Sequence, residues 1–219
     1  MTSFTPIVTL TKIVANPADS RVRHDLRDVQ RMHQVLMSLA CPPDFGPSSR
    51  SAAGLLYRIE HTAVGVHILM QSATQPDPAR LSPGYGMAGS RDLTPLLDQL
   101  ETDVVVRYRI VVNPTKSSHQ GADQRGKRQG LAGDEAMAWW ARRANQCGLA
   151  LRDTQMSGGG TITGFRRGQQ QRSRIAIATA KFEGVASVKD AAAVRDSILT
   201  GIGRGRAYGC GLLSVAVLR

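Results

Sequence analysis

The hydrophobic pattern of this chain changes period in the same order in both halves, and this order limits the fold more than any other feature. Residues 6–14 are rich in β-branched side chains and alternate as a strand does. Residues 25–40 then place apolar side chains three and four positions apart, as one face of a helix does. The first half is expected to hold a strand at 6–14, a helix at 25–40, strands at 54–61 and 64–72, a surface loop at 73–90 and a helix at 93–100. Its order is therefore β-α-β-β-α.

The second half repeats this order and adds a final strand. It is expected to hold a strand at 104–112, a basic loop at 115–130, a helix at 134–146, strands near 148–156 and 174–183, a helix at 190–199 and a strand at 212–218. Residues 157–174 are too polar and too rich in glycine for a core strand, so we expect them to form a protruding basic hairpin or loop.

The β-α-β-β-α-β order is that of the ferredoxin-like, RRM-type module. We therefore predict an α+β fold of two tandem ferredoxin-like βαββαβ domains, at residues 1–100 and 101–219. The first unit lacks a fourth strand in this prediction, and the strand at 104–112 is either shared between the units or assigned to the wrong one. Aromatic residues make up only 5% of the chain, which argues against RNA binding by aromatic stacking on a sheet face.

Positive charge is concentrated in the second half. The formal net charge is +11, and residues 101–219 hold 19 Lys and Arg against 9 Asp and Glu, compared with 9 against 8 in residues 1–100. Such a field favours polyanionic partners, with nucleic acid first and an acidic membrane second. A basic surface that is merely solvated is the alternative.

The N-terminal residues have neither a basic segment nor an apolar core typical of a signal peptide, and no apolar run is long enough to span a bilayer. The three cysteines, Cys41, Cys147 and Cys210, are scattered and show no spacing typical of a disulfide framework or a zinc site. We expect a cytoplasmic protein with no cofactor, no bound metal and no membrane partner.

A glycine-rich run near the C-terminus combines backbone freedom with charge. Its glycines are Gly201, Gly203, Gly205, Gly209 and Gly211. Glycine lets the backbone approach a phosphate closely, and Arg204 and Arg206 add positive charge. The run differs from a nucleotide-binding P-loop, which follows a strand and ends in Gly-Lys-Ser/Thr. A turn that only packs two domains together is the other interpretation.

The segment Gly201–Leu213 (GIGRGRAYGCGLL) resembles the C-terminal loop of CasE proteins, whose pattern is GIG-x-x-[KR]-[AS]-x-G-x-G-L-L. Residues 181–184, residues 109–116 and residues 67–72 are similar to that family at corresponding places. The resemblance implies an endoribonuclease with two ferredoxin-like domains. Its substrate would be the CRISPR repeat hairpin, cut at the 3′ base, and its product would be the guide RNA of the Cascade complex.

Residues 28–36 are similar to the first-helix motif of the CasE family, Y-x-x-H. His33 matches the catalytic histidine, but Gln30 stands where the family has tyrosine. Gln30 cannot act as an acid or a base. Tyr57 and Tyr208 are candidates to replace the tyrosine in space, and Tyr208 is the first because it lies in the glycine-rich run. Without the resemblance, a lone histidine on the apolar face of a helix is more often a packed core residue.

The reaction that the resemblance implies needs few groups. The 2′-hydroxyl of the RNA attacks the adjacent phosphate, a base removes its proton, and an acid protonates the departing 5′-oxygen. Our hypothesis is that His33 acts as acid or base, while Arg206 or the loop amides stabilise the phosphorane. The products would carry 2′,3′-cyclic phosphate and 5′-hydroxyl ends. No metal is required, and the sequence shows no clustered acidic signature of two-metal cleavage.

RNA recognition would rest on phosphate geometry and hairpin shape, because duplex RNA hides its base edges in a deep major groove. The candidate contacts are Lys116, Arg125, Lys127, Arg128, Arg166, Arg167, Arg172 and Arg174, together with Arg204, Tyr208 and the five glycines of the run. Any of these arginines could instead be a solvated loop residue.

Two other functions remain open. The first is a non-catalytic scaffold of the same fold, which binds the RNA hairpin or docks onto Cascade without cutting, and Gln30 is the feature that favours it. The second is a basic two-domain nucleic-acid chaperone unrelated to CRISPR.

Overall fold

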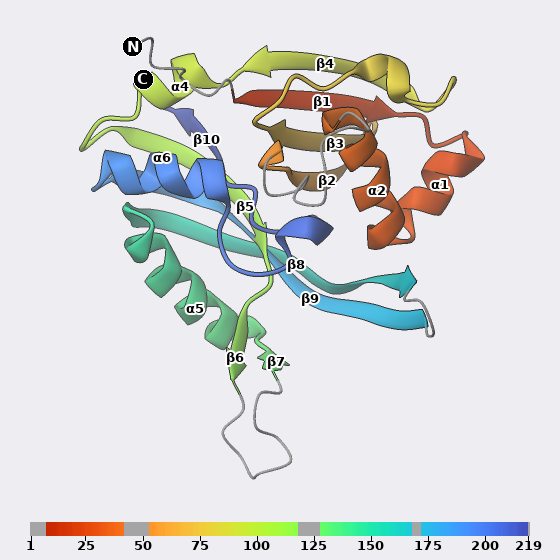
Figure 1. Ribbon diagram of the computed structural model, residues 1–219. Coiled ribbons are helices and arrows are strands. Elements are labelled where there is room, and N and C mark those ends of the chain that lie inside the picture. The colour runs from red at the N-terminus through yellow and green to blue at the C-terminus, as the bar shows by residue number, and fades with distance from the viewer. Residues whose placement is uncertain (1–7, 42–52, 118–127, 168–171, 219) are drawn as a thin grey trace.

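The computed structural model describes residues 8–41, 53–117, 128–167 and 172–218, and in them the chain forms two four-stranded antiparallel sheets (Figure 1). The strand orders are β2-β3-β1-β4 and β10-β5-β9-β8. In each sheet the first strand in the chain lies between the third and the fourth, which is the arrangement of the ferredoxin-like fold. The expected α+β class and the two tandem ferredoxin-like domains are confirmed.

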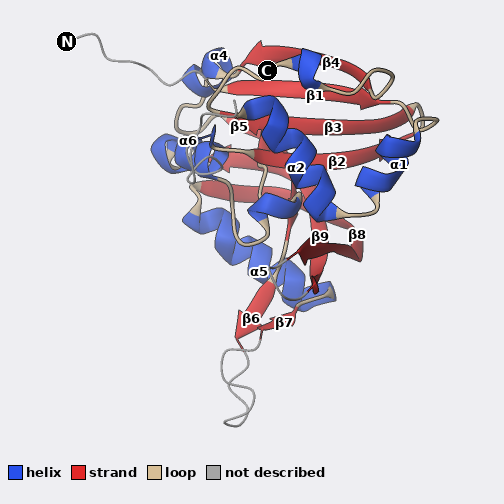
Figure 2. Cartoon of the chain, turned by 45° about the vertical axis from the view of Figure 1, so that its right-hand side comes forward, coloured by secondary structure: helices blue, strands red, loops and turns tan. Residues whose placement is uncertain are grey.

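The first sheet and its helices come from residues before 100. They are β1 (Thr9–Ala15), α1 (Ser20–Leu26), α2 (Val29–Ala40), β2 (Leu56–Thr62), β3 (Gly65–Ser72), the 3-10 turn η1 (Pro78–Arg80), β4 (Gly86–Asp92) and α4 (Thr94–Asp98). The helices α1 and α2 lie across one face of this sheet (Figure 2).

The second sheet follows in the chain. Its elements are β5 (Val105–Val112), β6 (Thr115–Ser117), β7 (Arg128–Gly130), α5 (Gly133–Gln146), β8 (Leu149–Arg167), β9 (Arg172–Val188), α6 (Ala191–Thr200), the 3-10 turn η3 (Arg206–Tyr208) and β10 (Ser214–Val217). Trp140 of α5 is fully buried, stacks on Phe182 of β9 with ring centroids 5.6 Å apart, and donates a hydrogen bond to Tyr108 at 3.2 Å. This aromatic contact fixes α5 against the sheet.

The missing fourth strand of the first unit is β4, so the expectation of a surface loop over 73–90 is wrong in its second part. The strand is glycine-containing, mostly exposed and paired only with β1, so it has no apolar alternation to reveal it. A side chain at Gly86 would collide with the carbonyl of Val14. The strand at 104–112 is β5 of the second sheet and is not shared.

The predicted helix at 25–40 corresponds to α2, which begins at Val29, and the chain turns at Arg27 and Asp28 after a separate helix, α1, that was not predicted. The Asp28 side chain caps α2 by accepting hydrogen bonds from the amides of Gln30 (2.9 Å) and Arg31 (3.4 Å). The buried face of α2 is the apolar stripe expected from the sequence, with Met32 and Leu36 fully buried against the sheet.

Residues 157–167 and 172–174 of the basic segment belong to β8 and β9, which pair as one long antiparallel hairpin, so of the two expected forms the structure shows the hairpin. Bulges at Leu151/Asp153 and Ser157/Gly159 interrupt its ladder. Near its end, the amide of Phe165 donates to the Asp28 carboxylate at 3.3 Å. The hairpin of the second sheet therefore reaches the first turn of α2.

Among the described helices, none has the length and apolar character needed to cross a membrane.

Candidate active site and RNA-facing surface

The glycine-rich run forms a closed loop between α6 and β10. All five glycines have positive φ, between +75° and +88°, a region that other residues rarely adopt. The amide of Ile202 donates to the carbonyl of Gly211 at 3.0 Å, which closes the loop. A side chain at Gly209 would come within 3.2 Å of the Tyr57 ring of β2. The loop therefore packs the second domain against the first, as one interpretation of the sequence expects, and it also carries exposed arginines.

This packing brings Tyr208 of the loop next to α2. The Tyr208 and His33 rings meet edge-on, with centroids 6.2 Å apart. The Tyr208 hydroxyl donates a hydrogen bond to Oε1 of Gln30 at 3.2 Å and accepts one from Nη2 of Arg166 at 2.7 Å. In Figure 1 the loop lies between α2 and the β8–β9 hairpin, the elements from which these partners come. The structure thus gathers three separate segments around His33.

His33 lies one turn into α2, beside the buried Met32, and its own side chain is only partly buried. The imidazole is thus partly accessible from solvent, although its Nδ1 is buried. The N-terminal cap of α2 and the hydrogen bond from Phe165 fix the turn of helix that carries Gln30 and His33. A side chain held on a capped helix is well suited to precise placement beside a substrate.

The Arg206 side chain contacts residues of the glycine-rich loop and the end of α6. Its guanidinium is exposed and donates to the carbonyl of Thr200 at 2.7 Å, and its aliphatic part passes over Gly211. Arg204 is also exposed. Both arginines carry positive charge at the surface of the loop, while the side chain that the loop presents to His33 is Tyr208.

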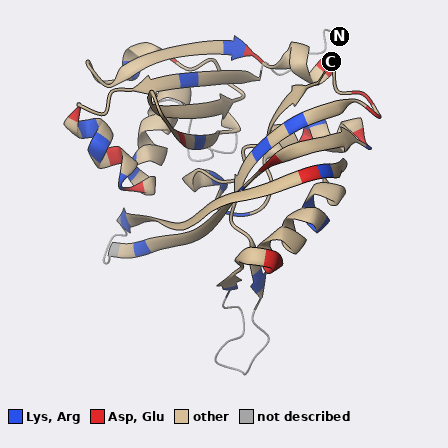
Figure 3. Cartoon of the chain, turned by 180° about the vertical axis from the view of Figure 1, so that it is seen from behind, with Lys and Arg blue, Asp and Glu red and all other residues tan. Residues whose placement is uncertain are grey.

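The predicted RNA contacts lie on two hairpins. Arg166 and Arg174 are exposed near the far end of the β8–β9 hairpin, and Lys116 and Arg128 are exposed on the β6–β7 hairpin. Basic segments are seen at both places in Figure 3. Lys116 also forms an ion pair with Glu135 at 2.5 Å. Arg125 and Lys127 lie outside the described residues, as do the side chains of Arg167 and Arg172.

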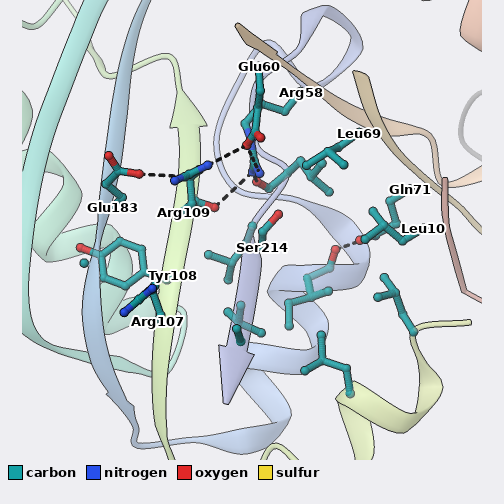
Figure 4. Close-up of a pocket in the computed structure, with 18 of the residues that line it drawn as sticks. Leu10, Arg58, Glu60, Leu69, Gln71, Arg107, Tyr108, Arg109, Glu183 and Ser214 are labelled. Atoms are coloured by element: carbon teal, nitrogen blue, oxygen red, sulfur yellow. Dashed lines mark hydrogen bonds and ion pairs between the residues drawn. The ribbon is translucent and has the colours of Figure 1, made fainter. Parts of the chain in front are cut away.

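A cavity of about 600 Å³ lies between the two sheets (Figure 4), and its lining also includes Leu96 of α4 and Ile198 of α6. Its lining includes neither His33 nor any residue of the predicted RNA contacts. Arg58 is 3% exposed there, and it donates to the Glu60 carboxylate at 2.7 Å and to the carbonyl of Leu212 at 3.1 Å. Arg109 bridges Glu60 at 3.2 Å and Glu183 at 2.7 Å.

The charges in this cavity largely neutralise one another. Burial alone would raise the pKa of Glu60, but Arg58 and Arg109 outweigh it and the pKa is lowered. Burial lowers the pKa of Arg58, and Glu60 opposes that effect. The Arg58–Glu60 pair lies within β2, whereas Arg109 of the second sheet pairs with Glu60 of the first, and Arg58 donates to the carbonyl of Leu212. These contacts join the two sheets, so we assign the network to holding the domains together rather than to proton transfer.

Sequence reasoning noted Gln30 only as a departure from a motif. The structure gives it a partner, the Tyr208 hydroxyl, which lies 178 residues away. The sequence offered Tyr208 and Tyr57 as candidates to replace the missing tyrosine, and the structure shows that the hydroxyl next to Gln30 is that of Tyr208. Across the described ranges, no group of three or more His, Cys, Asp or Glu side chains could hold a metal ion.

Comparison with known proteins places this chain in a family. The model of a family described as CRISPR associated protein matches residues 9–217. The CRISPR-associated endoribonuclease Cse3 of Thermus thermophilus is 30% identical, covering 94% of this chain and 99% of its own length. The Cascade subunit CasE of Escherichia coli is 29% identical, covering 88% of this chain and 94% of its own.

The fold agrees with these relatives. A structure of Cse3 bound to a 19-nucleotide RNA superposes with a TM-score of 0.79 and 28% identity, covering 96% of this chain and 99% of that one. The similarity therefore spans both domains, the helix that carries His33 and the glycine-rich loop. The chain belongs to the CasE family of CRISPR-associated proteins.

Proposed function

We propose that this protein is a metal-independent endoribonuclease. It cuts CRISPR repeat RNA at the 3′ base of the repeat hairpin and stays bound to the product within Cascade. The observation that carries the proposal is the meeting of His33 with the glycine-rich loop through Tyr208. It is supported by relatives that are named as an endoribonuclease and as a Cascade subunit, one of them solved with RNA. The cysteine pattern favours the cytoplasm as its location.

The proposed chemistry uses groups that the fold already places together. His33 acts as general acid or base in the attack of the 2′-hydroxyl on the adjacent phosphate. Arg206 and the amides of the glycine-rich loop stabilise the negative charge of the phosphorane. The products are a 2′,3′-cyclic phosphate and a 5′-hydroxyl. In this proposal residues 1–100 form the domain that carries His33, and residues 101–219 form the basic domain that binds RNA.

A non-catalytic scaffold of the same fold is the second candidate. It is favoured by Gln30, which cannot transfer a proton at the position where the resemblance places a tyrosine. The contact of a tyrosine hydroxyl with Gln30 itself weighs against it, since a proton-transfer group still lies beside His33.

Cleavage of the CRISPR repeat RNA of the host organism tests the proposal. In the presence of EDTA, we expect cutting at the 3′ base of the hairpin. The upstream fragment should end in a 2′,3′-cyclic phosphate, and the downstream fragment should begin with a 5′-hydroxyl. Mass spectrometry of the fragments identifies both ends. Tight binding of the hairpin without any cutting would establish the scaffold instead, and cutting that EDTA abolishes would refute metal independence.

Replacing Arg174 by alanine tests the RNA-facing side of the β8–β9 hairpin. A lost phosphate contact is expected to weaken hairpin binding and to reduce the slope of log Kd against log salt by about 1. Filter binding of the repeat hairpin at several salt concentrations measures both. Arg152→Ala is the matched control, because Arg152 is exposed on the same hairpin but bonded to Ser187 at its other end. Equal slopes for Arg174→Ala and the wild type would remove Arg174 from the RNA interface.

A further inference from the structure

Tyr208 combines three properties that separate it from the other polar side chains of the glycine-rich loop. It lies edge-on to His33, it carries a proton that it can donate, and it is only partly buried. Arg204 and Arg206 carry charge but hold their protons permanently in proteins. The cleavage reaction needs two proton-transfer groups, one for each oxygen, and His33 supplies only one of them at a time.

The hydrogen bonds of Tyr208 show in which direction its proton is available. A phenol has one O–H to donate, and here it points to Oε1 of Gln30 on α2, the helix that also carries His33. The phenol oxygen accepts from Nη2 of Arg166 at 2.7 Å. The hydroxyl is therefore arranged as a proton donor on the side of the molecule where His33 lies.

Arg166 places a positive charge at the phenol oxygen of Tyr208. A guanidinium N–H directed at the phenol oxygen stabilises the negative charge that develops there as the proton leaves. The same hydrogen bond raises the pKa of Arg166, so its guanidinium remains charged. Gln30 cannot transfer a proton itself, but its Oε1 accepts the hydrogen bond that orients the Tyr208 hydroxyl.

We propose that Tyr208 is the general acid of RNA cleavage, paired with His33 as the general base. His33 takes the proton of the 2′-hydroxyl, whose oxygen forms a bond to phosphorus. The bond between phosphorus and the 5′-oxygen breaks, and its electron pair stays on that oxygen, which takes the phenol proton of Tyr208. The imidazolium then returns a proton to the phenolate through water, so no other reactant is consumed. This inference rests on the proposed endoribonuclease function.

Tyr57, the other tyrosine that the sequence offered as a candidate, does not fit this role. It is 1% exposed, and its hydroxyl donates to the backbone carbonyl of Val29 at 3.4 Å. Burial raises its pKa strongly. A hydroxyl enclosed by protein on this side cannot contact a phosphodiester, so Tyr57 is a structural residue and a suitable control.

Single-turnover cleavage by Tyr208→Phe tests the assignment. The phenylalanine keeps the ring that packs near His33 and removes only the hydroxyl. We expect the rate of the chemical step to fall about 100-fold, while the Kd for the repeat hairpin stays within about twofold of the wild type because a ring remains in place. Tyr57→Phe, which loses a hydroxyl beside the same helix, is expected to cut at the wild-type rate.

A substrate with sulfur in place of the bridging 5′-oxygen at the cleavage site separates acid catalysis from a structural role. A thiolate leaves without being protonated, so Tyr208→Phe is expected to cut this RNA nearly as fast as the wild type does. A defect of equal size on the oxygen and sulfur substrates would overturn the acid role, and so would an undiminished rate on the oxygen substrate. If the wild type itself fails to cut either RNA, the proposed function has failed rather than this assignment.

Discussion

Replacing His33 by alanine is expected to lower the single-turnover rate of repeat cleavage about a thousandfold, within the range that general acid–base catalysis contributes. The reason is that the variant removes the imidazole beside Tyr208 and leaves the loop, the hairpins and their charges in place. Because phosphate contacts provide most of the affinity for RNA, the Kd for the hairpin is expected to change little. Rapid-quench assays at saturating protein measure the rate, and filter binding measures the Kd.

His61→Ala provides the matched control for this experiment. His61 is exposed on β2, its side chain carries the same titratable group, and nothing assigns it to the site. Its removal is expected to leave both rate and affinity unchanged. If His33→Ala cuts as fast as His61→Ala, then His33 is not a catalytic residue and the proton must be taken by another group. If it loses affinity in parallel with rate, its role is in binding.

Replacing Arg58 by alanine is expected to reduce the free energy of unfolding by about 3 kcal/mol or more, as does removal of one partner from a buried ion pair. Arg58 satisfies the Glu60 carboxylate of the first sheet and the backbone carbonyls of Arg109 and Leu212 in the second. Without it, the two carbonyls lose this side-chain donor, and Glu60 keeps only its ion pair with the half-exposed Arg109. Urea unfolding at neutral pH, followed by circular dichroism, measures the loss.

The control for Arg58 is the exposed Arg152, whose side chain makes a single hydrogen bond to Ser187. Arg152→Ala is expected to change the free energy of unfolding by less than about 0.5 kcal/mol, as surface substitutions usually do. Similar small losses for both variants would show that the network between the sheets contributes little to stability. In that case packing of the glycine-rich loop against β2 would be the main connection between the domains.

The sequence predicted best the elements that bury one continuous apolar face. The stripe on α2, with Met32 and Leu36 inward, follows the helical period because one side of that helix covers the first sheet. The alternation in β5 is equally clear, because one face of this strand packs against α5 and α6. Such a period depends only on which side of a single element is buried, so it can be recognised within that element.

Elements without a buried face were missed or misplaced. The edge strand β4 is held by backbone hydrogen bonds to β1, which leave no pattern in its side chains. A hairpin or loop was expected at 157–174, but the strands predicted near 148–156 and 174–183 were too short, because the exposed, glycine-rich ends of β8 and β9 lack an apolar alternation. Backbone pairing with a neighbouring strand determines both the edge strand β4 and the full length of β8 and β9.

The sequence by itself determined the fold class, the family, the histidine on the first long helix and the glycine-rich loop, because each is encoded in a local pattern or motif. Only the tertiary structure decided which tyrosine lies beside that histidine. Tyr208 reaches Gln30 and His33 because five glycines with positive φ fold the loop against β2, and because β8 extends far enough to bring Arg166 to the same place. Contacts between such distant residues form only when both sheets are in place, so no local pattern can specify them.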